Sequence, residues 1–74
     1  MRHDEAEARI DNALRNGLDT LDLSSLRLTE LPGRVAELTG LTELYLDDNW
    51  LTELPDWLGT LTALAVLDLE NNRL

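Results

Sequence analysis

The sequence lacks the residues on which most active sites depend. It contains no cysteine and no lysine, and its one histidine is His3. Without cysteine there can be neither a disulfide nor a cysteine zinc site. Ser24 and Ser25 have no histidine near them, so no nucleophile–base pair can be assembled, and no glycine-rich phosphate loop is present. Paired carboxylates occur, but their spacing matches no calcium loop. We therefore expect no enzyme activity, no cofactor and no metal.

The chain also lacks a long apolar run. We find no segment typical of a signal peptide or of a membrane span. Together with the absence of cysteine, which fits a reducing compartment, this predicts a soluble cytoplasmic protein. The 74 residues make one small domain. A domain of this size buries only about 60% of the surface of its unfolded chain, so contacts with other chains become relevant to its stability.

Positive charge is scarce. Fifteen acidic residues face six arginines, which gives a net charge of −9. The excess lies in residues 18–74, where eleven acids accompany three arginines. Such a surface repels nucleic acid phosphates and anionic lipids and attracts basic partners. We expect binding to a basic protein surface, and neither nucleic acid nor membrane binding.

Residues 4–16 have the pattern of an amphipathic helix. Asp4 and Glu7 have the spacing of a capping box, and Gly17 is placed to end the helix in a left-handed conformation. The helix could cover the first core edge of a repeat array, with residues 1–17 as an N-terminal capping helix, or it could be a free partner-binding helix. The apolar residues share one face of the helix and are Ala6, Ile10, Ala13 and Leu14.

From residue 18 onward the sequence repeats every 23 residues. Leu21, Leu44 and Leu67 are equivalent, since 44 − 21 = 23 and 67 − 44 = 23. Each lies in an LxL segment, whose period of two predicts a strand with leucine on one face. Asn49 and Asn72 follow two of these strands, where an amide side chain can bind backbone groups of the turn. The opposite, open face would carry the intervening residues, which are Thr20, Asp22, Ser24, Glu43, Tyr45, Asp47, Val66, Asp68 and Glu70.

The pattern LxxLxLxxNxLxxLPxxLxxLxx resembles the 23-residue leucine-rich repeats of intracellular proteins. The resemblance covers residues 18–74, as two full repeats and a truncated third within a single domain. It implies a curved right-handed solenoid with parallel strands on the concave face. Together with the N-terminal capping helix described above, this makes α/β the expected fold class. The three-residue spacing of Val35, Leu38 and Leu41 predicts a short helical or 3₁₀ turn on the convex side. The resemblance also implies protein–protein recognition. It does not imply a specific partner, and the family has no universal binding residues that could be assigned to positions in this sequence.

The open strand face is the first candidate interaction site. Its acids surround one tyrosine, Tyr45, a residue type enriched at interfaces. We interpret this face as a binding surface for an arginine- or lysine-rich partner; the alternative is that it only keeps a small sheet soluble. The proposed contact residues are Asp22, Glu43, Tyr45, Asp47, Val66, Asp68 and Glu70.

The two tryptophans are the second candidate. Trp50 occupies the repeat position of Arg27 and Arg73, and Trp57 occupies the position of Arg34. Positions that accept arginine are expected to face solvent, where an exposed tryptophan favours protein binding. Alternatively, each ring lies flat over the adjacent repeat and shields it.

The third candidate is the C-terminal edge, where the sequence stops within the third repeat, at Leu74. The last strand would leave its backbone groups unpaired, with Leu67, Leu69 and Leu74 partly uncovered. The chain could be a fragment or an engineered minimal repeat, its edges could pair in a homo-oligomer, or another protein could cover them. A further hypothesis is an acidic decoy that inhibits a nucleic-acid-binding protein.

Overall fold

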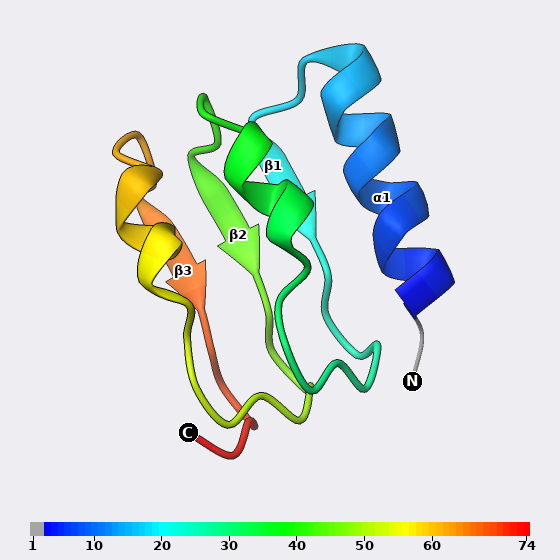
Figure 1. Cartoon of the computed structure of the whole chain (residues 1–74), viewed down its shortest axis with the longest axis vertical. Helices are drawn as coiled ribbons and strands as arrows, with labels where there is room; N and C mark the ends of the chain where they lie inside the picture. The colour runs from blue at the N-terminus through cyan, green and yellow to red at the C-terminus, as the bar shows by residue number, and fades with distance from the viewer. Residues whose placement is uncertain (1–2) are drawn as a thin grey trace.

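The computed structural model describes residues 3–74 as a helix followed by three stacked coils (Figure 1). The coils comprise residues 18–40, 41–63 and 64–74, and each contains one short strand. The elements are α1 (His3–Asn16), β1 (Thr20–Asp22), the 3₁₀ helix η1 (Gly33–Glu37), β2 (Glu43–Tyr45), the 3₁₀ helix η2 (Asp56–Thr60) and β3 (Val66–Asp68).

The strands form one parallel, open sheet in the order β1-β2-β3. Leu21 pairs with Leu44, and Leu44 with Leu67, so the sheet register equals the sequence period and that prediction is confirmed. The two 3₁₀ helices lie over the same face of the sheet, as Figure 1 shows. Each 3₁₀ helix follows a proline, which fixes φ at the entry to the turn.

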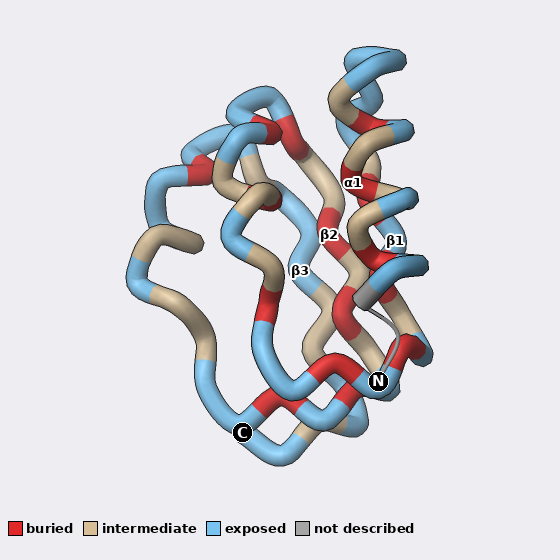
Figure 2. The backbone as a smooth tube through the Cα atoms, turned by 45° about the vertical axis from the view of Figure 1, so that its right-hand side comes forward, coloured by how far each residue is buried: buried red, intermediate tan, exposed pale blue. Residues whose placement is uncertain are grey.

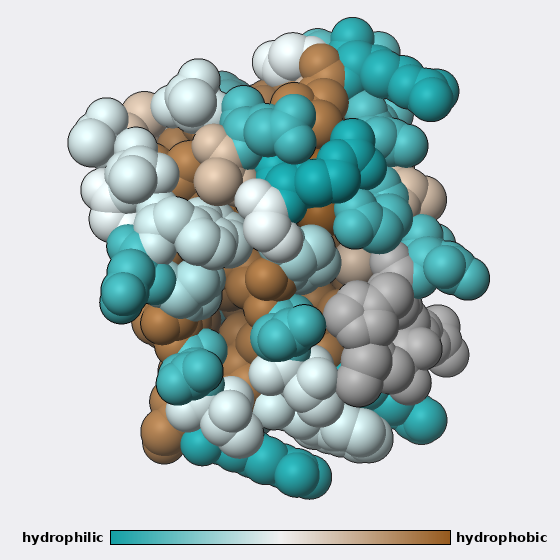
Figure 3. Space-filling view, viewed as in Figure 1, coloured by the Kyte–Doolittle hydropathy of each residue, from teal (hydrophilic) through white to brown (hydrophobic). Residues whose placement is uncertain are grey.

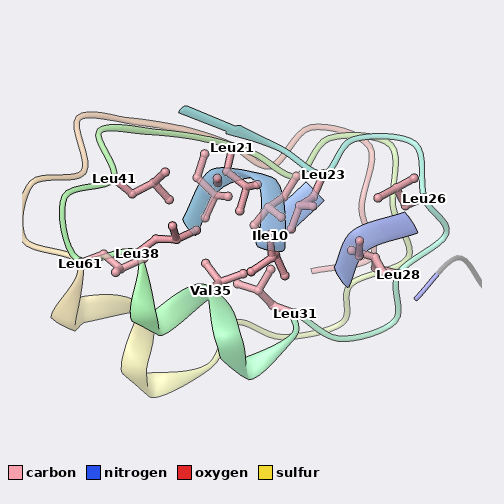
Figure 4. Close-up of a cluster of buried hydrophobic side chains, with 14 of the residues drawn as sticks. Ile10, Leu21, Leu23, Leu26, Leu28, Leu31, Val35, Leu38, Leu41 and Leu61 are labelled. Atoms are coloured by element: carbon pink, nitrogen blue, oxygen red, sulfur yellow. The ribbon is translucent and has the colours of Figure 1, made fainter. Parts of the chain in front are cut away.

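The core lies between the sheet and the 3₁₀ helices. Leu21, Leu23 and Leu41 approach from the strand side, and Leu31, Val35 and Leu38 from the side of η1 (Figure 4). All six are buried. Burying a side chain of this kind contributes about 1.5–3 kcal/mol, so this layer is the main source of stability.

Two asparagines hold the coils in register. The Asn49 Oδ1 atom accepts hydrogen bonds from the backbone N–H groups of Leu26 and Leu28, each at 3.0 Å, while its Nδ2 atom donates to the carbonyls of Leu23 and Leu46. Asn72 repeats part of this pattern one coil later. The predicted role of these side chains is confirmed, since they satisfy backbone groups that would otherwise be buried unpaired.

Helix α1 covers the first coil. Of the four residues that the periodicity placed on one face, Ala6, Ile10 and Ala13 are buried and Leu14 is half-buried. Gly17 follows the helix at φ +59°. The expected capping box is wrong, because the helix already begins at His3 and therefore includes Asp4 in its first turn. Glu7 accepts a hydrogen bond from the guanidinium of Arg34 in the first coil, and this bond fixes the helix to that coil.

Burial decreases along the stack. Figure 2 shows buried residues along α1 and in the first two coils. In the third coil, residues 64–74, none is buried. Helix α1 also leaves part of the first coil uncovered. Leu18 is exposed, whereas its repeat equivalent Leu41 is fully buried. Leu18 occupies a leucine position of the repeat pattern, but it does not join the inner leucine layer.

Candidate functional site

The open face of the sheet brings the predicted acids together. In the sheet register Asp22 lies beside Tyr45, and Tyr45 lies beside Asp68. Glu43 lies beside Val66 in the neighbouring row. The central strand places Tyr45 in the middle of the sheet, with a carboxylate on either side. Glu70 follows β3 and stays exposed, and the Asp48 N–H donates to its carbonyl at 2.9 Å.

The carboxylates on this face interact with one another. Partial burial raises the pKa of Asp47, and the charges of Asp68, Asp48 and Asp22 raise it further. The Tyr45 hydroxyl donates a hydrogen bond to Glu43 Oε1 at 2.5 Å, and this bond, followed by burial and nearby carboxylates, raises the pKa of Tyr45. Negative charge is thus held close together around a fixed phenol ring.

Only the β1 edge of the open face receives a balancing cation from the described part of the chain. Arg9 of α1 donates to the Asp22 carbonyl at 2.9 Å, and its guanidinium lies 3.9 Å from the Asp22 carboxylate. The Ser24 hydroxyl and N–H donate to that carboxylate and, with Arg9, lower the pKa of Asp22. The uncompensated charge therefore lies over β2 and β3.

Trp50 forms a stack with two arginines. The centre of its ring lies 5.9 Å from the Arg27 guanidinium carbon and 5.3 Å from that of Arg73. The three residues occupy one repeat position in successive coils, so Trp50 has an arginine from the coil on either side. Trp50 is 40% exposed. These distances fit cation–π contacts, which keep both guanidiniums beside the ring.

The comparison with known families agrees with this geometry. Residues 16–74 match the family described as leucine rich repeat. The chain belongs to the leucine-rich repeat family. Leucine-rich repeat domains generally mediate protein–protein interactions and are generally not enzymes. No curated protein matches the sequence.

Over residues 3–74, no group of three or more histidine, aspartate or glutamate side chains is arranged to hold a metal ion. In the same range, no helix is long and apolar enough to cross a membrane.

The second tryptophan of the repeats lies in a different setting from the first. Trp57 is half-buried against the core and lines a groove with Glu30 and Leu31 of the preceding coil. Its repeat equivalent Arg34 is also half-buried, and it forms ion pairs with Glu7 and Asp11 of α1. Both side chains therefore pack partly against the element that precedes them, which for Trp57 agrees with the alternative in which the ring shields the adjacent repeat.

The last repeat has the most exposed apolar surface. Leu67 is 36% and Leu74 59% exposed, Val66 is exposed, and Leu69 is half-buried. In the space-filling view, hydrophobic surface reaches the side of the molecule where the C-terminus lies (Figure 3). The sheet order leaves the outer edge of β3 without a partner strand among residues 3–74.

Arg27 and Arg73 were not among the candidate residues predicted from the sequence. Each was recognised as the repeat equivalent of Trp50, but its contact with the indole was not inferred. A signal was present, because residues 23 apart are neighbours in a stack of 23-residue coils. Their equal spacing from Trp50 is sufficient to predict the contact.

Proposed function

We propose that this chain is a protein-binding module whose open sheet face contacts a basic surface of its partner. Residues 18–74 would form a solenoid with this face on its concave side, and residues 1–17 would cap its first coil. The observation that carries the proposal is the cluster of carboxylates over β2 and β3, which has no balancing cation among residues 3–74. The burial of Ala6, Ile10 and Ala13 against the first coil supports the capping role.

The physical basis is the field of the clustered acids. Carboxylates held close together make the local electrostatic potential more negative, and this speeds association with a cationic partner. Salt screens the potential and weakens the effect. Burial is the main cause of the raised pKa of Asp47, and repulsion from neighbouring carboxylates raises it further. Binding a guanidinium or ammonium group would relieve that repulsion. Tyr45 adds a large, fixed ring with a hydroxyl at the centre of the face. The face therefore offers both charge and a contact residue for a hot spot.

Neutralising two carboxylates tests the proposal. Asp47→Asn combined with Asp68→Asn should weaken binding of a fluorescein-labelled hexa-arginine peptide and make its affinity less dependent on salt. Fluorescence anisotropy over a range of salt concentrations measures both effects. Each lost ion pair at an exposed site is worth about 0.2–1 kcal/mol, so the two changes together should weaken binding about fivefold.

The matched control removes the same charge elsewhere. Glu30→Gln with Glu53→Gln alters two exposed acids that line the Trp57 groove and lie outside the strands. This variant should bind nearly as well as the unaltered chain. Equal losses in the two double variants would show that only net charge matters and would remove the open face from the proposal.

A second candidate function is suggested by the outer edge of β3. Its unpaired backbone groups and the exposed Leu67 and Leu74 could be covered by a second copy of the chain. Self-association of this kind would make the chain a structural building block. Light scattering over a concentration series tests it: the apparent mass should rise with concentration, whereas a constant monomer mass would contradict it.

A further inference from the structure

We propose that the Arg27–Trp50–Arg73 stack is a second binding site and that it takes a carboxylate-bearing segment of a protein partner. The inference rests on the proposed function only in taking the chain to bind proteins. It concerns a different surface and the opposite charge. The stack is cationic on a molecule whose net charge is −9.

The arginines of the stack differ from those that fix α1. Arg9 and Arg34 each form ion pairs with carboxylates of the chain. Arg27 and Arg73 are exposed and form no ion pair with any carboxylate of residues 3–74. Each guanidinium instead lies beside the Trp50 ring. Their charge is therefore available for a ligand, in a chain rich enough in acids to have paired them.

The backbone holds the stack in place. The Trp50 N–H donates to the Leu28 carbonyl and the Arg73 N–H to the Leu51 carbonyl, both at 2.8 Å. These bonds join successive coils beside the side chains of the stack. The Asn72 amide accepts from the Leu51 N–H, which fixes the same turn. Trp50 and Arg73 thus extend from a hydrogen-bonded ladder, and Arg27 directly precedes Leu28, whose carbonyl belongs to that ladder. A backbone held in this way lowers the entropy lost when a ligand binds.

The geometry of a guanidinium decides which ligand fits. An arginine that lies against an aromatic ring uses its flat face there and keeps its N–H edge free. That edge matches a carboxylate, which it can bind through two parallel hydrogen bonds. Two such arginines beside an exposed indole give the composition most enriched at protein hot spots. A peptide segment with glutamate or aspartate side chains can therefore bind both guanidiniums and the indole of the stack.

The two sites together define the partner more closely. Each coil runs from its strand into the turn that carries the stack, so the charge presented by the chain changes sign along the strand direction. A partner that covers both sites needs basic side chains over the strands and acidic side chains over the turns. The wrong orientation would place acid on acid, a repulsion that selects one direction of binding.

NMR titration of the indole N–H signals tests the inference. The probe is a capped tetraglutamate peptide, compared with tetraglutamine, and the Trp50→Phe variant assigns the two indole signals. Tetraglutamate should shift the Trp50 signal saturably, and tetraglutamine should not. In Arg27→Gln with Arg73→Gln the affinity should fall about fivefold, from two exposed charge pairs of about 0.5 kcal/mol each. Arg73→Gln alone should give an intermediate loss.

The controls separate this site from general charge effects and from the open face. Arg15→Gln removes an exposed arginine at the end of α1 and should leave the tetraglutamate affinity nearly unchanged. Asp47→Asn with Asp68→Asn should weaken hexa-arginine binding without weakening tetraglutamate binding, so either site can fail alone. An unshifted Trp50 signal, or equal losses with Arg15→Gln and the stack variant, would overturn the inference. A stronger response to a tetrathymidylate would assign the site to nucleic acid and also overturn it.

Discussion

The second and third coils use the same residues with different neighbours. Leu44 and Leu67 are paired in the sheet register, yet Leu44 is fully buried and Leu67 is 36% exposed. Asn49 is buried, and its Oδ1 atom accepts two hydrogen bonds, whereas Asn72 is half-buried and its Oδ1 atom accepts one. The second coil has a coil on each side, and the third has one. Side chains of the same type therefore gain their burial and hydrogen bonds from stacking, as in other repeat proteins.

Shortening the paired leucines should give the largest difference between the coils. Leu44→Ala creates a cavity in the core and should lower the free energy of unfolding by about 3 kcal/mol, within the usual range for a buried leucine. Leu67→Ala removes a side chain that is already partly hydrated and should cost about 1 kcal/mol. Urea denaturation followed by circular dichroism measures both. Equal losses would show that the third coil is covered in solution.

Removing the two asparagines should give the next largest difference. Asn49→Ala leaves the N–H groups of Leu26 and Leu28 and the carbonyl of Leu23 without partners in the interior. The Leu46 carbonyl keeps its hydrogen bond from Asn72. We expect a loss of about 2–3 kcal/mol, because an unsatisfied buried group costs about 1–3 kcal/mol and some of these groups will find water. Asn72→Ala frees groups nearer to solvent and should cost about 1 kcal/mol. The same urea titrations apply, and a greater loss in Asn72→Ala would contradict the comparison.

Features that repeat every 23 residues could be predicted from the sequence. The register of Leu21, Leu44 and Leu67 follows from their spacing, and the Asn49 ladder follows from its place after a strand. The position of the acids around Tyr45 follows from the alternation within each strand. The buried face of α1 was likewise predicted from helical periodicity. Each of these features depends on a regular pattern, which is the part of the structure that local sequence specifies.

Features that join unlike parts of the chain could not be predicted. Arg34 pairs with Glu7 and Asp11 because α1 occupies the place of a preceding coil, and no periodicity relates a helix to a repeat. Trp57 takes the equivalent position in the second coil and packs on leucine instead, because a coil precedes it. Leu18 is exposed for a related reason. A helix precedes the first coil, and it covers Leu18 less completely than a coil would.

The backbone of the turns offers a smaller, stabilising test. Ser25, Asp48 and Asn71 are repeat equivalents and share a left-handed conformation, with φ between 56° and 59°. Asparagine tolerates this region better than serine does. Ser25→Gly should therefore raise the free energy of unfolding by about 0.5 kcal/mol, whereas Asn71→Gly should change it little or lower it through the lost bond to Asp48. A destabilised Ser25→Gly would show that the strain is absent.

The smallest effects are expected from two aspartates on the open face, and pH distinguishes them. The pKa of Asp47 is raised above 3.8 by burial and by neighbouring carboxylates, so its ionised form opposes folding. That cost is present at neutral pH and disappears as pH falls through the raised pKa. The pKa of Asp22 is lowered below 3.8 by Ser24, so its ionised form favours folding. That gain is present above pH 3.8 and is lost as pH falls through the lowered pKa.

The two neutralising substitutions should therefore act in opposite directions at pH 7. Asp47→Asn should raise the free energy of unfolding slightly and Asp22→Asn should lower it, each by less than about 0.5 kcal/mol, as is usual for surface substitutions. Melting curves between pH 3 and pH 7 should show the advantage of Asp47→Asn fading first as the solution is acidified. The deficit of Asp22→Asn should persist to lower pH. A gain from both substitutions would mean that overall negative charge, and not the local partners of each carboxylate, governs the stability of this face.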